Sequence, residues 1–79
     1  MLYKRYIQVI TLIGKQGELT PMYVIWDDGI RYEIDKILEI RHATSKVGGS
    51  GILYRCLFGK TERSLFFEQN RWFMETSKP

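Results

Sequence analysis

The chain has 79 residues, a net charge of +3 and a single cysteine, Cys56. This length is that of one domain, which we expect to span residues 1–79, and a lone thiol excludes an internal disulfide. Cys56 and the only histidine, His42, cannot complete a tetrahedral zinc site between them, so no metal or cofactor is expected. The small core must then be stabilised by packing or by self-association.

The sequence also indicates a compartment. A single unpaired cysteine is typical of a reducing environment, and residues 1–13 are not followed by the cleavage pattern of a signal peptide. No apolar run approaches the ~20 residues that a membrane-spanning helix needs. We therefore expect a cytoplasmic protein without a membrane partner.

The charge is unevenly distributed along the chain. Residues 1–40 carry five basic and six acidic side chains, a balance of −1, whereas residues 41–79 carry seven and three, a balance of +4. The basic half would suit an anionic partner. An excess of this size also serves simply to keep a small protein soluble, so the charge alone does not choose between these interpretations.

The first predicted strand covers residues 3–13. Its β-branched side chains fall at alternate positions, which places four of them on one face: Ile7, Val9, Thr11 and Ile13. Residues 14–20 contain two glycines and no bulky apolar run, so we expect a turn there. Residues 22–26 alternate again, with three apolar side chains on one face: Met22, Val24 and Trp26.

An Asp-Gly pair follows at Asp28 and Gly29, and residues 30–34 return with alternating apolar side chains. This pattern predicts a β-hairpin with a two-residue type I′ turn, in which both Asp28 and Gly29 have positive φ. Tyr32 and Ile34 are then expected to face inward beside Trp26.

Four further strands are predicted, over residues 37–44, 52–58, 61–68 and 71–75. The glycine cluster at residues 48–51 and short turns at 59–60 and 68–70 separate them. Helical spacing of apolar residues also allows a short helix over residues 35–40. We favour a strand there, because β-branched residues recur and the glycine cluster ends the run.

Six or seven short antiparallel strands in this length predict an all-β fold, a small meander barrel of SH3-like or similar type. A flat open sheet would leave two exposed edges. Four large aromatic side chains are predicted to share its core: Trp26, Tyr32, Tyr54 and Trp72.

Three segments of the chain resemble a group of small bacterial proteins of unknown function. The segments read MYVIWDDGIRYEID, GGSGILYRCLFGK and SLFFEQNRWFME, and the resemblance covers roughly residues 20–75. In that group a Trp–acidic–Asp–Gly hairpin precedes a Tyr-x-Ile strand, a glycine-rich loop, a Tyr-x-Cys strand and a Phe-Phe…Arg-Trp-Phe ending. The matching positions are Trp26, Asp28, Gly29, Tyr32, Ile34, Gly48, Gly49, Gly51, Tyr54, Cys56, Phe66, Phe67, Arg71, Trp72 and Phe73.

This resemblance supports the predicted fold and carries over no catalytic residue. Distant relatives of the group are encoded beside translesion DNA polymerases, which associates the group with DNA metabolism.

The residues themselves indicate no enzyme. Cys56 lies between Tyr54 and Phe58 on an apolar strand face, where a buried thiol is inert. No spacing pairs His42 with a nucleophile and a carboxylate. The glycine cluster at residues 48–51 offers backbone N–H groups to a phosphate, but no Lys-Ser/Thr pair follows it, and a flexible hairpin connection explains it better.

Alternation instead predicts a basic and aromatic outer surface. If Tyr54 and Cys56 face the core, then Arg55 faces outward, and the same argument places Arg41, Phe66 and Phe73 outward as well. The candidate site consists of Arg41, Lys46, Arg55, Lys60, Phe66 and Phe73. Single-stranded nucleic acid binds such surfaces, because bases stack on rings while cations follow the phosphates.

Two alternatives remain open for this surface. Phe66 and Phe73 would equally serve as a second core layer, or as anchors for another protein or for a second copy in a dimer. The sequence thus predicts a non-enzymatic binding module with nucleic acid as the first ligand class, and protein interaction or self-assembly as the alternative.

Overall fold

The computed structural model describes residues 1–78, which form seven antiparallel strands and no helix. The strands are β1 (Tyr3–Ile13), β2 (Leu19–Ile25), β3 (Arg31–Glu33), β4 (Lys36–Thr44), β5 (Ser50–Phe58), β6 (Thr61–Glu68) and β7 (Arg71–Thr76). The all-β prediction is confirmed, and so is the choice of a strand over a helix for residues 37–44.

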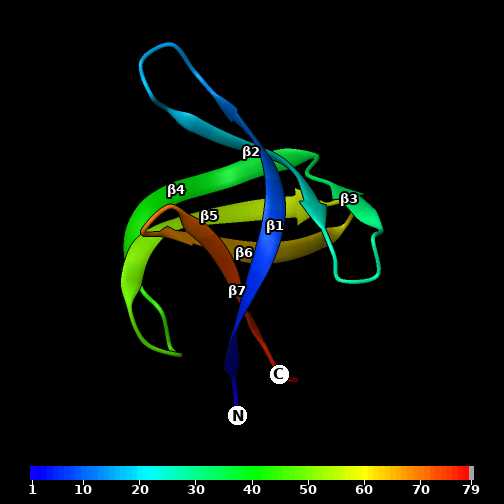
Figure 1. Ribbon diagram of the computed structural model, residues 1–79, viewed down its shortest axis with the longest axis vertical. Coiled ribbons are helices and arrows are strands. Elements are labelled where there is room, and N and C mark those ends of the chain that lie inside the picture. Colours follow the sequence, from blue (N-terminus) through cyan, green and yellow to red (C-terminus); the bar gives the residue numbers. More distant parts are fainter. Residues whose placement is uncertain (79) are drawn as a thin grey trace.

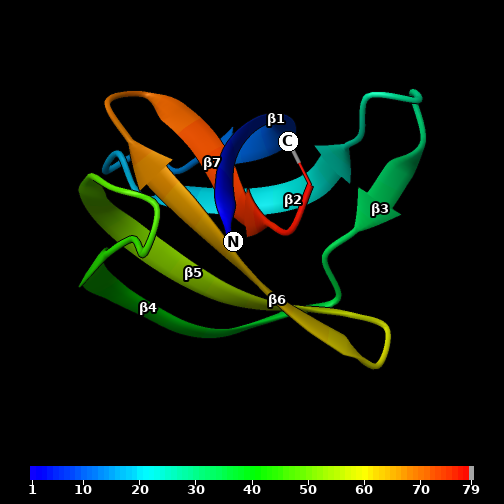
Figure 2. The same ribbon diagram turned by 90° about the horizontal axis from the view of Figure 1, so that it is seen from below.

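The strands make one curled sheet, a half-barrel, in the order β3-β2-β1-β7-β6-β5-β4. Each strand pairs with its neighbour in the chain except at β3/β4, where the chain passes from one edge of the sheet to the other. The pairing of β1 with β7 joins the two halves and brings the chain ends side by side (Figure 1). Seen from below, β1 and β2 lie on the opposite side of the curled sheet from β4 and β5 (Figure 2). The two edge strands, β3 and β4, do not pair with each other.

Three of the hairpin turns share one geometry. In the turns that begin at Gly14, Trp26 and Ser45, the first carbonyl accepts a bond from a glycine N–H three residues later. The first N–H in turn donates to the carbonyl four residues later. The glycines concerned have positive φ: Gly17 (89°), Gly29 (85°) and Gly48 (101°). This is a type I turn followed by a bulge at glycine.

The predicted hairpin at Asp28 and Gly29 is therefore present, but its turn type is wrong. Only Gly29 has positive φ, and Asp28 does not. The Asp28 carboxylate accepts a 2.9 Å bond from Ile30 N, which fixes Asp28 in an ordinary turn conformation. A two-residue type I′ turn does occur between β6 and β7, where Gln69 and Asn70 both have positive φ.

The inner face of the sheet holds the larger core. Its buried members are Val24, Tyr54, Cys56, Leu65, Trp72 and Met74. Tyr54 and Trp72 meet edge to face with ring centroids 5.0 Å apart. Both polar ends are bonded, since Tyr54 Oη donates to the Leu19 carbonyl at 3.3 Å and Trp72 Nε1 donates to Thr11 Oγ1 at 3.1 Å.

The predicted aromatic core is correct for Tyr54 and Trp72, and Trp26 is half-buried against the cluster to which they belong. It is wrong for Tyr32, whose side chain is 44% exposed. Tyr32 lies on β3, a three-residue strand at the edge of the sheet, so no further strand covers it.

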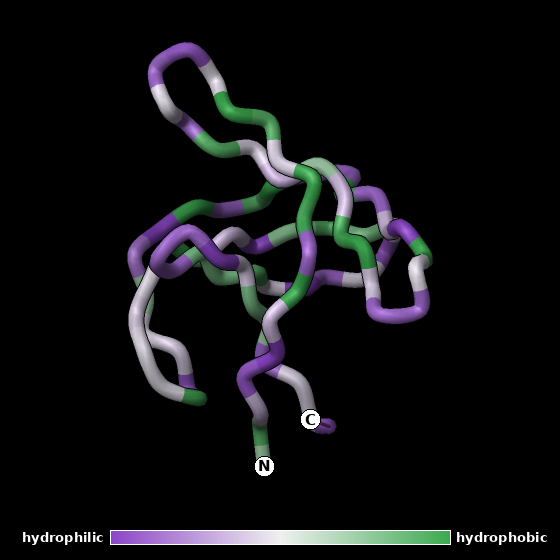
Figure 3. The backbone as a smooth tube through the Cα atoms, in the orientation of Figure 1, coloured by the Kyte–Doolittle hydropathy of each residue, from purple (hydrophilic) through white to green (hydrophobic). Residues whose placement is uncertain are grey.

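The hairpin of β1 and β2 projects beyond this core. Ile7 and Val9 pack against the core as expected, but Ile13 lies near the projecting tip and is largely exposed. A bulge between Ile10 and Thr11 interrupts the register where the hairpin leaves the body. Figure 3 shows the apolar run of β1 continuing into this arm below a hydrophilic tip.

Candidate binding surface

The structure places the predicted outer residues largely as alternation requires. Across neighbouring strands, Arg41 pairs with Leu53, Leu53 with Phe66, and Phe66 with Phe73. These side chains therefore form one row on the face opposite the inner core, because directly opposed residues share a face.

Phe66 and Phe73 are nevertheless inaccessible in this row. Phe73 is fully buried and Phe66 is 3% exposed, and their rings stack in parallel with centroids 4.9 Å apart. Together with Leu53 they make a second, smaller core, which Ala43 and Val47 help to cover. The expectation of exposed stacking rings is therefore wrong, and the second core layer is what the structure contains.

A hydrogen-bonded turn accounts for this burial. Glu75 Oε2 accepts bonds from Ser45 Oγ at 2.9 Å and from Lys46 N at 2.6 Å, which holds the β4–β5 turn against the outer face. From the other side, Lys4 Nζ lies 4.5 Å from the Phe73 ring centroid and bonds Glu68 at 2.9 Å. That bond raises the pKa of Lys4 and lowers the pKa of Glu68.

The basic side chains of the predicted site are also engaged or dispersed. Arg55 contacts Glu39 at 3.3 Å and Glu62 at 3.1 Å, and Arg41 contacts Glu39 at 3.6 Å. Lys46 and Lys60 are exposed, but they lie in the turns at opposite ends of β5. The six residues thus do not make one exposed basic and aromatic surface.

The strand β4 presents a feature that the sequence did not reveal. This nine-residue strand pairs with β5 on one side, and no strand of the described residues pairs with the other side. An unpaired strand edge carries a row of N–H and C=O groups that can bond another chain.

The direction of these groups follows from the hairpin. Ser45 N donates to the Gly49 carbonyl at 3.0 Å, so this pair belongs to the hydrogen-bonded set of the ladder. In an antiparallel ladder such pairs alternate with unbonded ones. The register from Thr44–Ser50 to Glu39–Arg55 then directs the N–H and C=O of three residues away from β5: Ile40, His42 and Thr44.

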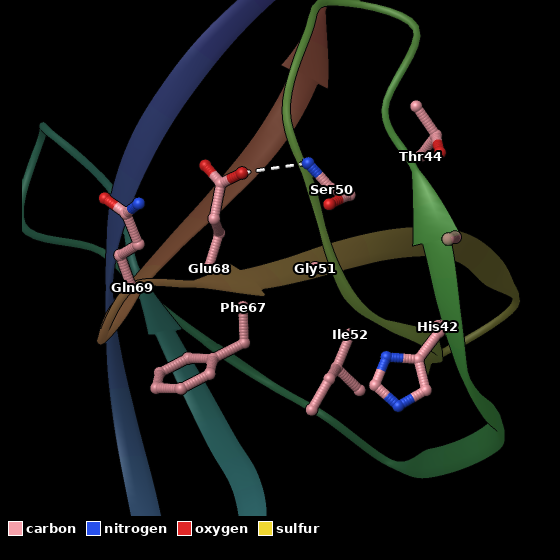
Figure 4. A pocket seen from close by; sticks show the side chains of 9 residues that line it. His42, Thr44, Ser50, Gly51, Ile52, Phe67, Glu68 and Gln69 are labelled. Carbon is pink, nitrogen blue, oxygen red and sulfur yellow. Dashed lines mark hydrogen bonds between the residues drawn. The ribbon is translucent and has the colours of Figure 1, made fainter.

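A hollow lies beside this edge, with a volume of about 580 Å³. His42 and Thr44 of β4, Ile52 of β5 and Phe67 of β6 contribute to its wall. Figure 4 shows His42 next to its cross-strand partner Ile52, and the Glu68 carboxylate bonded to Ser50 N at 2.9 Å. Two residues before His42 on β4, Ile40 exposes 55% of its surface.

A second groove, of about 340 Å³, lies at the other end of the inner face. Three aromatic rings line it, those of Trp26, Tyr32 and Phe58, together with the side chain of Arg63. The Arg5 guanidinium stacks over the Trp26 ring at 4.6 Å and pairs with Asp27 beside it.

Cys56, the thiol considered for catalysis, lies in the inner core. Cys56 is fully buried, and desolvation raises the pKa of its thiol to about 11. Burial also raises the pKa of the neighbouring Tyr54. Within residues 1–78, no group of His, Cys, Asp and Glu side chains could hold a metal ion.

The glycine cluster at residues 48–51 serves as a hairpin connection. Gly48 N donates to the Ser45 carbonyl at 3.2 Å, and Ser50 N donates to Glu68. Two of its N–H groups are therefore bonded within the chain and do not point toward a phosphate site.

Comparison with protein-family models, curated proteins and solved structures finds no match for this chain. In the part of the chain that the structure describes, no helix is long and apolar enough to cross a membrane.

Proposed function

We propose that this chain is a non-enzymatic binding module that adds an extended segment of a protein partner to the outer edge of β4. The observation that carries the proposal is the nine-residue edge, along which no described strand pairs. In this mode of recognition, main-chain hydrogen bonds supply affinity, while pockets beside the strand select side chains.

The surroundings of β4 suit such a segment. Ile40 offers exposed apolar surface at the middle of the strand. The hollow beside His42 and Thr44 is open to a side chain of an added strand. The opposite edge of the sheet is a poorer template, because β3 has only three residues, two of them charged.

Selection of peptides from a random displayed library on the immobilised protein tests this function. We expect enriched peptides with β-branched residues at alternate positions, because an added strand presents every second side chain to the inner face. Ile40→Lys should abolish their binding, since a charge on an edge strand opposes pairing. Ile30→Lys is the matched control, because Ile30 is similarly exposed but lies in the β2–β3 turn.

Two outcomes would reject the proposal. One is that no peptide sequence is enriched. The other is that the enriched peptides bind the Ile40→Lys and Ile30→Lys variants equally well, which would place their site away from β4.

A second candidate function, binding of single-stranded nucleic acid, is favoured by the aromatic groove of Trp26, Tyr32 and Phe58 with Arg63 at its wall. Bases would stack on these rings instead of on Phe66 and Phe73. Affinity for an oligonucleotide should then fall steeply with salt, and Tyr32→Ala should weaken it by about 1–3 kcal/mol. Absence of binding at low salt would remove this candidate.

A further inference from the structure

We infer that the segment added to β4 is supplied by a second copy of this chain, paired antiparallel through β4 about a two-fold axis at Ile40. The inference rests on the proposed function, and it names the partner and the register. It joins the two half-barrel sheets into one continuous sheet.

The direction of the edge groups limits the possible registers. Because Ile40, His42 and Thr44 direct their N–H and C=O outward, a bonded pair must join residues from this set in both copies. Pairing Ile40 with Ile40 of the second copy satisfies this condition. Shifts that move the axis toward Thr44 satisfy it as well, because Ile40 then lies opposite His42, or His42 opposite His42.

Charge then distinguishes among these registers. With the axis at Ile40, Glu39 lies opposite Arg41 of the second copy, and the same contact occurs again by symmetry. With Ile40 opposite His42, Arg41 faces Arg41 of the second copy. With His42 opposite His42, Arg41 faces Ala43, so neither register contains a pair of opposite charges. Like charges directly opposite one another are destabilising, whereas opposite charges stabilise a pair of strands.

Both charged side chains are partly exposed at the edge. Arg41 and Glu39 have side-chain exposures of 55% and 43%, and they already lie 3.6 Å apart within one copy. The exposed Ile40 side chains of the two copies meet on the inner face. Two paired edge strands bury less surface than a standard protein interface, so the dimer is expected to be weak and to depend on protein concentration.

Sedimentation of charge-reversed variants tests the inference. The wild-type chain should shift from monomer to dimer as its concentration rises. Glu39→Arg and Arg41→Glu should each remain monomeric at the concentration where the wild type is dimeric. An equimolar mixture of the two variants should dimerise, because every facing pair then joins a positive and a negative side chain.

Glu62→Arg is the control. It also removes a carboxylate partner of Arg55, but Glu62 lies on β6, away from the edge, so dimerisation should be unchanged. Circular dichroism of each variant establishes that it is folded, and recovery of the dimer in the mixture shows that neither variant lost the ability to pair.

A wild-type chain that stays monomeric at all concentrations would overturn the inference, and so would a dimer that persists in both variants. These failures differ from a failure of the proposed function. One result would be that the monomeric wild-type chain still selects peptides that do not bind the Ile40→Lys variant. In that case the edge binds another protein, and only the inference that the partner is a second copy is rejected. If the chain selects none, both are rejected.

Discussion

The Ser45 hydroxyl donates a 2.9 Å hydrogen bond to Glu75, 30 residues later in the chain. The same carboxylate oxygen accepts the Lys46 N–H at 2.6 Å, so one side chain of β7 holds the turn between β4 and β5. This contact keeps Val47 against the outer core and explains why Phe66 and Phe73 are buried on a face that alternation alone would leave exposed.

Glu75→Ala should release this turn. Because hydrogen bonds to a charged group contribute about 1.5–3 kcal/mol each, we expect the free energy of unfolding to fall by about 2 kcal/mol or more. Denaturant titration measures the loss, and binding of a hydrophobic dye reports exposure of the outer core. Glu62→Ala is the control, since its carboxylate makes only an exposed contact. Equal stability of the two variants would contradict the role of Glu75.

Phe73→Ala should destabilise the domain by about 3–5 kcal/mol, the usual cost of removing a buried phenylalanine ring. The fully buried ring contacts Phe66 and Lys4 from opposite sides. Tyr32→Ala, at an exposed aromatic on β3, should cost much less. A folded Phe73→Ala domain with an unchanged unfolding midpoint would show that the outer aromatics are a surface and not a core.

The period of two along each strand was sufficient to predict which side chains share a face. It placed Arg41, Phe66 and Phe73 together correctly, because strand alternation is a local property. Whether that face is covered depends on the bond between Ser45 and Glu75, which joins residues far apart in the sequence and leaves no local pattern.

The edge at β4 was unpredictable for the same reason. β4 is an edge because β7 pairs with β1 and so joins the two halves of the sheet elsewhere. Such long-range pairing has no periodicity of its own. The turn at Asp28 shows a smaller limit, since an Asp-Gly pair fits both a two-residue turn and the longer turn with a glycine bulge.

Gly29→Val should destabilise the domain by about 1 kcal/mol or more. Gly29 has a φ of 85°, which a β-branched side chain adopts only with strain. Gly29→Asn is the matched variant, because asparagine tolerates this region better, and it should retain more of the stability. Thermal unfolding compares the two. Equal melting temperatures for the wild type and Gly29→Val would contradict the turn geometry.

Cys56 should be unreactive toward thiol reagents in the native state. Its pKa of about 11 lies far above neutral pH, so little thiolate is present, and the side chain is fully buried. The labelling rate at neutral pH should therefore rise with denaturant as the domain unfolds. Rapid labelling of the native protein would contradict this burial and reopen a chemical role for the thiol.

Amide hydrogen exchange along β4 tests the central claim most directly. In the dilute protein, the amides of Glu39, Arg41 and Ala43 should be protected by β5, and those of Ile40, His42 and Thr44 should exchange rapidly. On adding a selected peptide, the second set should become protected. If the second copy is the partner, raising the protein concentration should protect Ile40, which lies at the two-fold axis. Protection of Ile40, His42 and Thr44 in the dilute monomer, or rapid exchange at saturating peptide, would contradict the account.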